Sequence, residues 1–332
     1  MAEYVNEEAF FNAIYNFQIP EIPSDTRFWM IRTKKGYFYQ EFLEKQFVAL
    51  AWNNITKSTD FGNPESLNDS ILMDYPEIKR PSLVINKCKN FINEISPNDI
   101  LVIPSAGSKF ITFAYAGEYF EEESKTVELE QTVINRIEHG EVVISEVACP
   151  YRKRRHITII RTIPSDIVNH HLYKAITSYH GISNLDEHGT YILDHLFNYY
   201  TYKNNTRFVF HVGKTDPITS KEFSGFLYNA NVFLTAIGID DSAISTQASV
   251  QSIGDIIYNI KDLGQFLSDN YLWFIAIFVV LGGGKFLTVE LPGLPNIIKN
   301  ILSISDERKF SKEKLTEKSS IMLFALSSFK KK

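Results

Sequence analysis

Cysteine is scarce in this sequence, with two among 332 residues, Cys88 and Cys149. Two cysteines so far apart in the chain form neither a disulfide framework nor a metal-type cluster, so a reducing compartment is the simplest inference. The opening segment MAEYVNEEAFF has no basic stretch followed by an apolar one, and we therefore expect no secretory signal. Together these absences predict a cytoplasmic location for the main body of the protein.

Signatures of catalysis are missing as well. The glycines Gly282–Gly284 are not followed by the Lys-Ser/Thr pair of a P-loop, and there is no GxSxG or HExxH. His170 and His171 are neighbours that point in different directions, and no carboxylate follows them at ligand spacing. Asp99 opens a strand-like run, but the Glu-x-Lys of a nuclease does not follow. We therefore expect no enzymatic activity, no metal and no cofactor.

An excess of positive charge is also absent, since 34 Lys and Arg stand against 39 Asp and Glu and the net charge is −5. This balance argues against a protein that coats nucleic acid non-specifically. The charge is uneven along the chain, because residues 305–332 hold eight basic and four acidic residues. We interpret 305–332 as a charged tail.

Long hydrophobic runs are absent with one exception, the eleven residues YLWFIAIFVVL at Tyr271–Leu281. A helix of that length reaches roughly 16 Å, about half of a hydrocarbon layer of ~30 Å. Extension to Val289 brings it near spanning length, with Lys285 close enough to the end for its side chain to snorkel. The run is therefore either a membrane-inserted segment or a buried core or interface helix.

The residues after this run favour a hairpin. PGLP breaks the chain after Leu291, and NIIKNILSI then has the pattern of a short amphipathic helix. Lys299, Arg308 and Lys309 favour a cytoplasmic position for the C-terminal side. Because the preceding body is also expected in the cytoplasm, a re-entrant or interfacial hairpin over 263–304 satisfies both constraints.

Strand-like and helical patterns alternate through the rest of the chain. Runs rich in β-branched and aromatic residues predict strands at 28–33, 47–52, 99–105, 110–120, 141–148 and 156–163. Helical spacing predicts helices over 3–17, 82–95, 172–181 and 190–200. Since one clear helix interrupts the strands, a small β-barrel capped by helices fits better than a doubly wound sheet.

A second module follows the polar break at 202–206. It has a strand pattern at 207–212, a helix pattern over 219–238 and two strand patterns at 243–251 and 255–260. We therefore predict an α+β protein with five segments. These are an N-terminal helix and loop (1–26), a small barrel (27–202), a β-α-β-β module (203–262), an apolar helical hairpin (263–304) and a tail (305–332).

A basic run, YRKRR at Tyr151–Arg155, opens the strand predicted at 156–163. Adjacent cations at a strand start are suited to phosphate contacts, and Tyr151 to base stacking. The alternative is a solvated loop balanced by the six glutamates of 118–130.

Two tryptophans, Trp29 and Trp52, fall inside predicted strands, each near a polar neighbour. Tryptophans in the strands of a small barrel are either core residues or the walls of a pocket for a planar base. Ser105 follows the strand DILVIPS and lies where its hydroxyl would reach a base edge at the rim of a barrel.

The order of these elements resembles the EVE-type domains of the PUA-like superfamily. The resemblance rests on FWMIRTKKGYFYQEFLEKQFVALAW, LVINKCKNFINEI, SPNDILVIPSAGSKFITFAYAGEYF and RKRRHITIIRTIPSDIVNHHLYKAI, and it covers residues 27–197. It implies binding of a base, often a modified one flipped from nucleic acid, in an aromatic-walled pocket. The residues that the resemblance would place at this pocket are Trp29, Arg32, Trp52 and Ser105, with Arg152, Arg154 and Arg155 on the backbone. The net negative charge departs from that pattern and favours a small nucleotide ligand over tight duplex binding.

We therefore expect a bacterial antiviral-defence sensor and effector that binds a nucleotide or modified nucleic-acid signal. It would act at the cytoplasmic face of the inner membrane, where residues 265–304 contact lipid, as a homo-oligomer with other defence-operon proteins as partners. The membrane part rests on an analogy of layout. The alternative is a soluble, cytoplasmic, oligomeric nucleic-acid-binding or interaction protein, such as the recognition subunit of a restriction system, with the apolar run in its core or interface.

Overall fold

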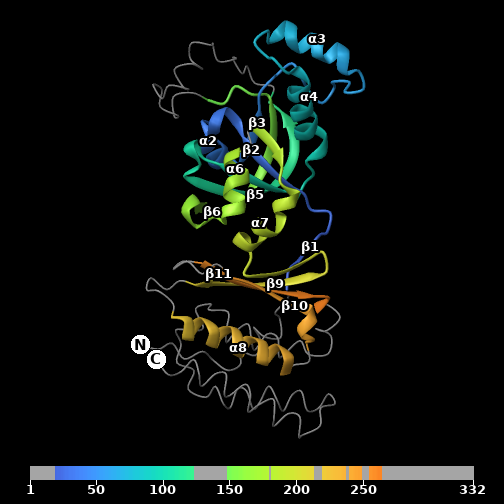
Figure 1. The fold of residues 1–332 in the computed structure, drawn as a ribbon. Coiled ribbons are helices and arrows are strands. Elements are labelled where there is room, and N and C mark those ends of the chain that lie inside the picture. Colours follow the sequence, from blue (N-terminus) through green and yellow to red (C-terminus); the bar gives the residue numbers. More distant parts are fainter. Residues whose placement is uncertain are drawn as a thin grey trace, which may run out of the picture. The chain divides into compact units, whose positions relative to one another are not determined.

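The protein has a mixed α+β fold in a computed structural model that describes residues 19–122, 148–178, 181–212, 219–236, 239–248 and 254–263 (Figure 1). The chain divides into two compact units, Asp25–Leu196 and the combination of Met1–Ser24 with Phe197–Lys332. The α+β class predicted from the sequence is confirmed. The helix predicted over 3–17, the apolar hairpin and the charged tail lie outside the described residues.

The unit Asp25–Leu196 is built on a six-stranded sheet that curls into a half-barrel (Figure 1). In spatial order its strands are β3 (Phe47–Leu50), β6 (Lys153–Pro164), β5 (Phe110–Glu121), β4 (Ile100–Pro104), β2 (Phe28–Arg32) and β7 (Gly181–Asn184). The pair β2 and β4 is parallel, and the other neighbours are antiparallel. Because β2 and β4 run in the same direction, their carboxyl ends lie side by side at one end of the sheet.

Both faces of this sheet are covered, which explains the unbroken apolar runs of β2 and β4. Inside the curl, Trp29, Ile31, Leu101 and Ile103 belong to the main hydrophobic core. On the opposite face the ring of Phe113 stacks on His195 of helix α7. Alternate residues of each strand thus enter two different apolar environments.

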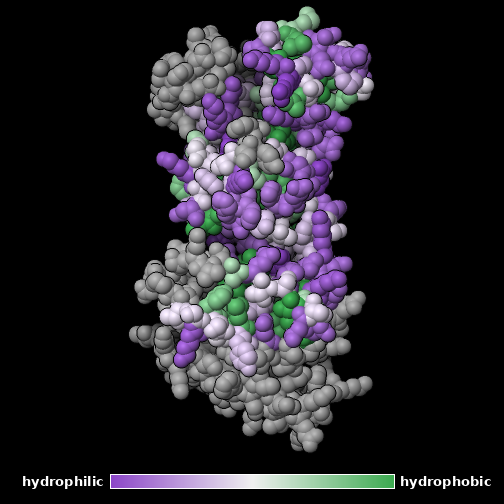
Figure 2. Space-filling view, viewed as in Figure 1, coloured by the Kyte–Doolittle hydropathy of each residue, from purple (hydrophilic) through white to green (hydrophobic). Residues whose placement is uncertain are grey.

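The described residues of this unit include five α-helices. Their bounds are α2 (Tyr39–Lys45), α3 (Pro64–Asp74), α4 (Pro81–Lys89), α6 (His170–Ser178) and α7 (Gly189–Leu196), and α4 continues as a π-helical turn at Asn90–Glu94. The helix predicted over 82–95 is thereby confirmed. The helix α3 was not predicted, although Asn63 caps it and Pro64 occupies its first turn. On the face that Figure 2 shows, hydrophilic side chains predominate, with hydrophobic ones visible between them near α3.

The other unit contains a five-stranded sheet. In spatial order its strands are β1 (Glu21–Ile22), β8 (Tyr199–Tyr202), β9 (Asn205–Val212), β11 (Gly254–Lys261) and β10 (Ile244–Ala248), accompanied by helix α8 (Ser220–Ala236). The order β9, α8, β10, β11 is the predicted β-α-β-β order. The helix predicted over 190–200 ends at Leu196, because the aromatic YYTY run continues as the strand β8. Within the described part of the chain, no helix has the length and apolar character needed to cross a membrane.

Candidate functional site

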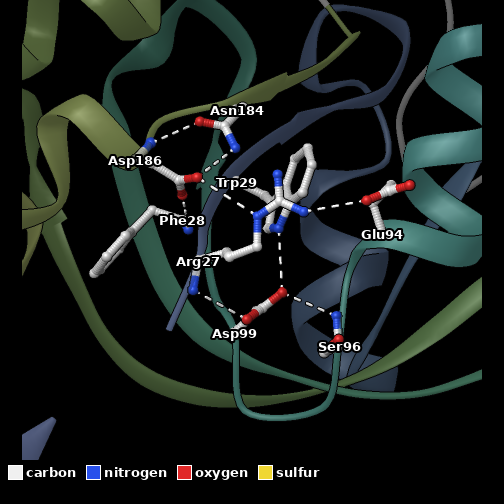
Figure 3. Close-up of polar contacts among 8 residues, drawn as sticks. All are labelled: Arg27, Phe28, Trp29, Glu94, Ser96, Asp99, Asn184 and Asp186. Carbon is white, nitrogen blue, oxygen red and sulfur yellow. Dashed lines mark hydrogen bonds and ion pairs between the residues drawn. The ribbon is translucent and has the colours of Figure 1, made fainter. Parts of the chain in front are cut away.

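Trp29 lies at the amino end of β2 in a network of polar contacts (Figure 3). Its side chain is 1% exposed, and its Nε1–H donates to Asp99 Oδ2 at 3.2 Å. The Asp99 carboxylate also accepts the backbone N–H groups of Arg27 at 3.1 Å and of Ser96 at 2.9 Å. The Arg27 guanidinium lies 4.5 Å from the centre of the Trp29 ring. With its polar edge bonded and its ring buried, Trp29 has the environment of a core residue.

Further bonds extend this network to the chain after β7. Arg27 forms ion pairs with Glu94 at 3.3 Å and with Asp186 at 3.5 Å. Asp186 Oδ1 accepts the backbone N–H of Phe28 at 2.8 Å, and Asn184 donates to Asp186 Oδ2 at 2.7 Å. The ion pairs are part-exposed and contribute little on their own. The network therefore holds the three strands together at the end of the sheet where β2 and β4 begin and β7 ends.

The basic run at 151–155 enters the strand β6, which begins at Lys153. The ring of Tyr151 is 8% exposed and packs edge-on against Phe38 with 5.7 Å between the ring centres. Lys153 is 0% exposed, and its Nζ donates to the carbonyl of Trp52. Arg152 is half-buried, and its backbone N–H donates to Asn53 Oδ1 at 2.9 Å. The structure therefore places most of this run inside the unit.

Arg154 has structural partners for its whole guanidinium. Its Nε donates to the carbonyl of Tyr151 at 2.9 Å, its Nη2 to that of Cys149 at 3.0 Å, and its Nη1 pairs with Glu122 at 3.1 Å. Its Cζ also lies 4.4 Å from the centre of the Phe47 ring. These contacts fasten the chain that enters β6.

Arg155 is 2% exposed and fastens two irregular segments. Its Nη1 donates to the carbonyl of Gly117 at 2.7 Å, at a β-bulge in β5, and its Nη2 to that of Phe91 at 3.1 Å in the π-helical turn. Burial lowers the pKa of Arg155 from its ordinary value. A phosphate contact by this guanidinium would require the segments around it to open.

Trp52, the second predicted pocket wall, is half-buried and packs against the main core. Its φ of 66° is in the left-handed region, which is rare for a bulky residue. The Trp52 carbonyl accepts the N–H of Ile55 at 3.0 Å as well as the Lys153 ammonium. These two hydrogen bonds to its carbonyl hold the Trp52 backbone in its left-handed conformation.

The carboxyl ends of β2 and β4 carry two loops in direct contact, Arg32–Gly36 and Ser105–Lys109, which we call the β2–β4 rim. Five of its residues have positive φ, namely Lys34, Lys35, Gly36, Gly107 and Ser108. A Cβ on Gly36 would lie 2.7 Å from the backbone of Ser105 and Ala106, so only glycine permits this close approach. Backbone strain of this kind is concentrated at functional sites.

Arg32 of the rim has fewer partners than Arg154 or Arg155 of β6. Its Nη2 donates to Ser108 Oγ at 2.6 Å, and its buried Nε, like that of Arg155, has no hydrogen-bond partner. Among the described residues no carboxylate forms an ion pair with it, and burial lowers its pKa from the ordinary value, opposed by the nearby Tyr173. Arg32 is therefore a poorly solvated positive charge that lacks a negative partner in the described part of the chain.

Ser105, the remaining predicted residue, lies in the same rim. It is 7% exposed, and its Oγ accepts the backbone N–H of Phe110 at 2.9 Å. The structure thus brings Arg32 and Ser105 together, whereas Trp29 lies at the amino ends of the same strands.

Lysines that the sequence reasoning did not select add to the charge of the rim. Lys34 and Lys35 belong to its first loop, and Lys109 ends the second. The Nζ of Lys87 would lie 3.3 Å from a Cβ on Gly181, the residue paired with Arg32 in the sheet. The signal in the sequence is the run RTKKG directly after an apolar strand.

The described residues contain no group of three or more His, Cys, Asp or Glu side chains placed to hold a metal ion. The chemistry that the rim offers is hydrogen-bonded and ionic binding of an anion by guanidinium, ammonium and hydroxyl groups. Comparison of the chain with protein families, curated proteins and solved structures found no match.

Proposed function

We propose that the unit Asp25–Leu196 binds the phosphate of a nucleotide or nucleic acid at the β2–β4 rim. The observation that carries this proposal is Arg32, a half-buried guanidinium with an unpartnered Nε and with Ser108 as its hydrogen-bond partner. An incoming phosphate would supply the missing negative charge. Arginine suits this role because its planar fork matches phosphate oxygens in geometry.

Two further features support a phosphate ligand. The lysines of the rim raise the local positive potential, although the whole chain carries a charge of −5. Such an arrangement favours one anionic ligand at one place over general adhesion to nucleic acid. The resemblance of 27–197 to PUA-like domains independently favours a nucleotide.

In the full proposal, ligand binding is the sensing step of a defence-type protein that acts at the inner membrane. The support for the second half is the sequence of Tyr271–Leu281 and the hairpin pattern after it. High-speed centrifugation of a lysate without detergent tests it directly. Recovery of the full chain in the membrane pellet is the expected result, and recovery in the supernatant contradicts the membrane half alone.

The substitution Arg32→Gln tests the sensing half. Loss of charged hydrogen bonds to phosphate amounts to about 1.5–3 kcal/mol, which corresponds to roughly 10- to 150-fold weaker binding. Fluorescence anisotropy with a labelled single-stranded oligonucleotide measures the effect, and competition by unlabelled nucleotides and by tripolyphosphate identifies the ligand class. The control is Arg80→Gln, an exposed arginine before α4 with the same change of charge. Equal affinities for the two variants and the wild type would contradict the proposal.

A further inference from the structure

The strand β10 (Ile244–Ala248) forms one edge of the five-stranded sheet, and among the described residues its only strand partner is β11. Its last four residues, Ser245–Ala248, are all exposed, so side chains on both of its faces contact solvent. The five residues pair with Ile256–Ile260 in continuous register. The backbone N–H and C=O groups on the outer side of β10 are therefore in position to pair with a further strand.

Proteins usually protect such an edge with charged side chains, proline, a bulge or a very short strand. The opposite edge of the same sheet follows this rule, because β1 has two residues and lies between Pro20 and Pro23. The edge strand β3 of the six-stranded sheet has all four of its residues buried. The strand β10 has none of this protection, and the sequence from Ser242 to Gly254 contains no charged residue and no proline. An edge of this kind is open to a specific partner strand.

The uncharged edge is complementary to a second copy of itself. When a strand pairs antiparallel with its own copy, the two-fold axis passes between one residue and the same residue of the copy. An axis at Thr246, the middle residue, pairs all five residues of β10. Thr246 then lies opposite Thr246 of the second copy, and Ser245 lies opposite Gln247. These polar side chains can hydrogen-bond across the pair, whereas a charged residue at the axis would face its own like charge.

We propose that two copies of the chain pair antiparallel through β10, with Thr246 at the two-fold axis, and join their five-stranded sheets into one continuous sheet. Both exposed edges are covered at once, so the assembly closes as a dimer. The proposal gives the expected homo-oligomer a defined interface. It is independent of the phosphate site, because Arg32 belongs to the unit Asp25–Leu196 and β10 belongs to the other unit.

The substitution Thr246→Cys in the full chain tests the pairing through disulfide formation. Directly opposite residues of antiparallel strands have Cα atoms about 4.5–5.5 Å apart, and a disulfide spans roughly 4.4–6.8 Å between Cα atoms. We expect mild oxidation of a whole lysate to give a reducible band at twice the mass of one chain. Use of the whole lysate retains chains that are bound to membranes. The native cysteines Cys88 and Cys149 are both buried, and the wild type measures any background from them.

Two single-cysteine variants are the controls. Met73→Cys places a thiol at an 84% exposed residue of the other unit and measures cross-linking by random collision. Ser245→Cys places the two thiols at diagonal positions of the pair, with Cα atoms about 7–8 Å apart, beyond the reach of a disulfide. A band for either control as strong as that of Thr246→Cys overturns the proposal, and so does the absence of a band for Thr246→Cys.

Charges at the flanking positions test the register directly. Addition of Ser245→Lys and Gln247→Lys to Thr246→Cys places like charges opposite each other across the dimer, and the band should disappear. With Ser245→Lys and Gln247→Glu, opposite charges face each other and the band should be retained. The residues paired with these positions in β11, Asn259 and Ile257, are uncharged, so the contrast between the two variants arises at the interface. Equal cross-linking of the two triple variants overturns the proposal.

Discussion

Removal of the Asp99 carboxylate is the sharpest test of how the half-barrel is held together. Asp99 is 4% exposed and accepts three N–H groups, from Trp29 Nε1 and from the backbones of Arg27 and Ser96. The bond to Trp29 is buried, whereas the other two are part-buried. Asp99→Ala leaves all three donors without their acceptor.

The expected magnitude follows from the burial of each donor. A buried donor that loses its acceptor costs about 1–3 kcal/mol, and this applies in full to the Trp29 indole. The part-buried backbone donors of Arg27 and Ser96 regain bonds to water and add roughly 1 kcal/mol between them. We therefore expect Asp99→Ala to lower the free energy of unfolding by about 2–4 kcal/mol, a large part of the 5–15 kcal/mol that is typical of a domain. Asp99→Asn keeps one acceptor oxygen and should lose about half as much.

Hydrogen exchange measured by mass spectrometry on peptides that cover β2 and β4 reports on this unit separately from the rest of the chain. The matched control is Asp60→Ala, which removes an exposed carboxylate that accepts one bond, from the N–H of Gly62 at 2.8 Å. A double-mutant cycle with Trp29→Phe should show a coupling of about 1 kcal/mol, because the two substitutions remove the same bond. The reasoning is refuted if the free energy of unfolding of Asp99→Ala lies within about 0.5 kcal/mol of that of the wild type.

Three further predictions follow from the geometry. Gly36→Ala should lower the free energy of unfolding by about 2 kcal/mol or more, because the new Cβ would lie 2.7 Å from backbone atoms. Gly107→Ala places its Cβ in open space and should lower that free energy by only about 1 kcal/mol. Equal urea midpoints for the two variants would contradict this. Burial raises the pKa of Cys88 from 9.0 to about 11 and that of Cys149 from 9.0 to about 12. A disulfide reagent at pH 8 should therefore react with these thiols only after unfolding, and unfolding free energy should fall as the pH rises above 9, because the unfolded thiols ionise first. Arg155→Met should lower unfolding free energy by about 2–4 kcal/mol without a change in oligonucleotide affinity; normal stability with lost affinity would instead support a phosphate contact.

Much of the fold could be predicted from local pattern. The apolar runs FWMI and ILVI appear as the buried strands β2 and β4, and the stripe over 82–95 appears as α4 with its π-helical turn. The pairing of the strands could not be predicted in the same way. The parallel contact of β2 with β4 joins segments about 70 residues apart, and nothing local to either strand selects that partner.

The candidate site shows the same division. Arg32 ends a buried strand and Ser105 follows one. The sequence predicted Ser105 at a rim, and the resemblance to PUA-like domains placed both residues beside a ligand pocket. The lysines of RTKKG stand beside Arg32 in the sequence and were overlooked in favour of YRKRR, which has the higher density of charge. The density of positive charge was misleading, because it does not reveal whether the folded chain places a carbonyl acceptor beside each cation.

The sequence by itself determined the α+β class, the net negative charge and many of the strands and helices, among them β2, β4 and α4. Those properties follow from side-chain periodicity and composition, which act over a few residues. Only the tertiary structure decided which hydrogen-bond and ion-pair partners each charged side chain has. The Arg155 guanidinium donates to carbonyls 38 and 64 residues away, those of Gly117 and Phe91. The Arg32 guanidinium donates to the Ser108 hydroxyl and to no described carboxylate. The physical reason is that solvation and partners set the energy of a charge, and both are supplied by distant parts of the chain that only folding brings together.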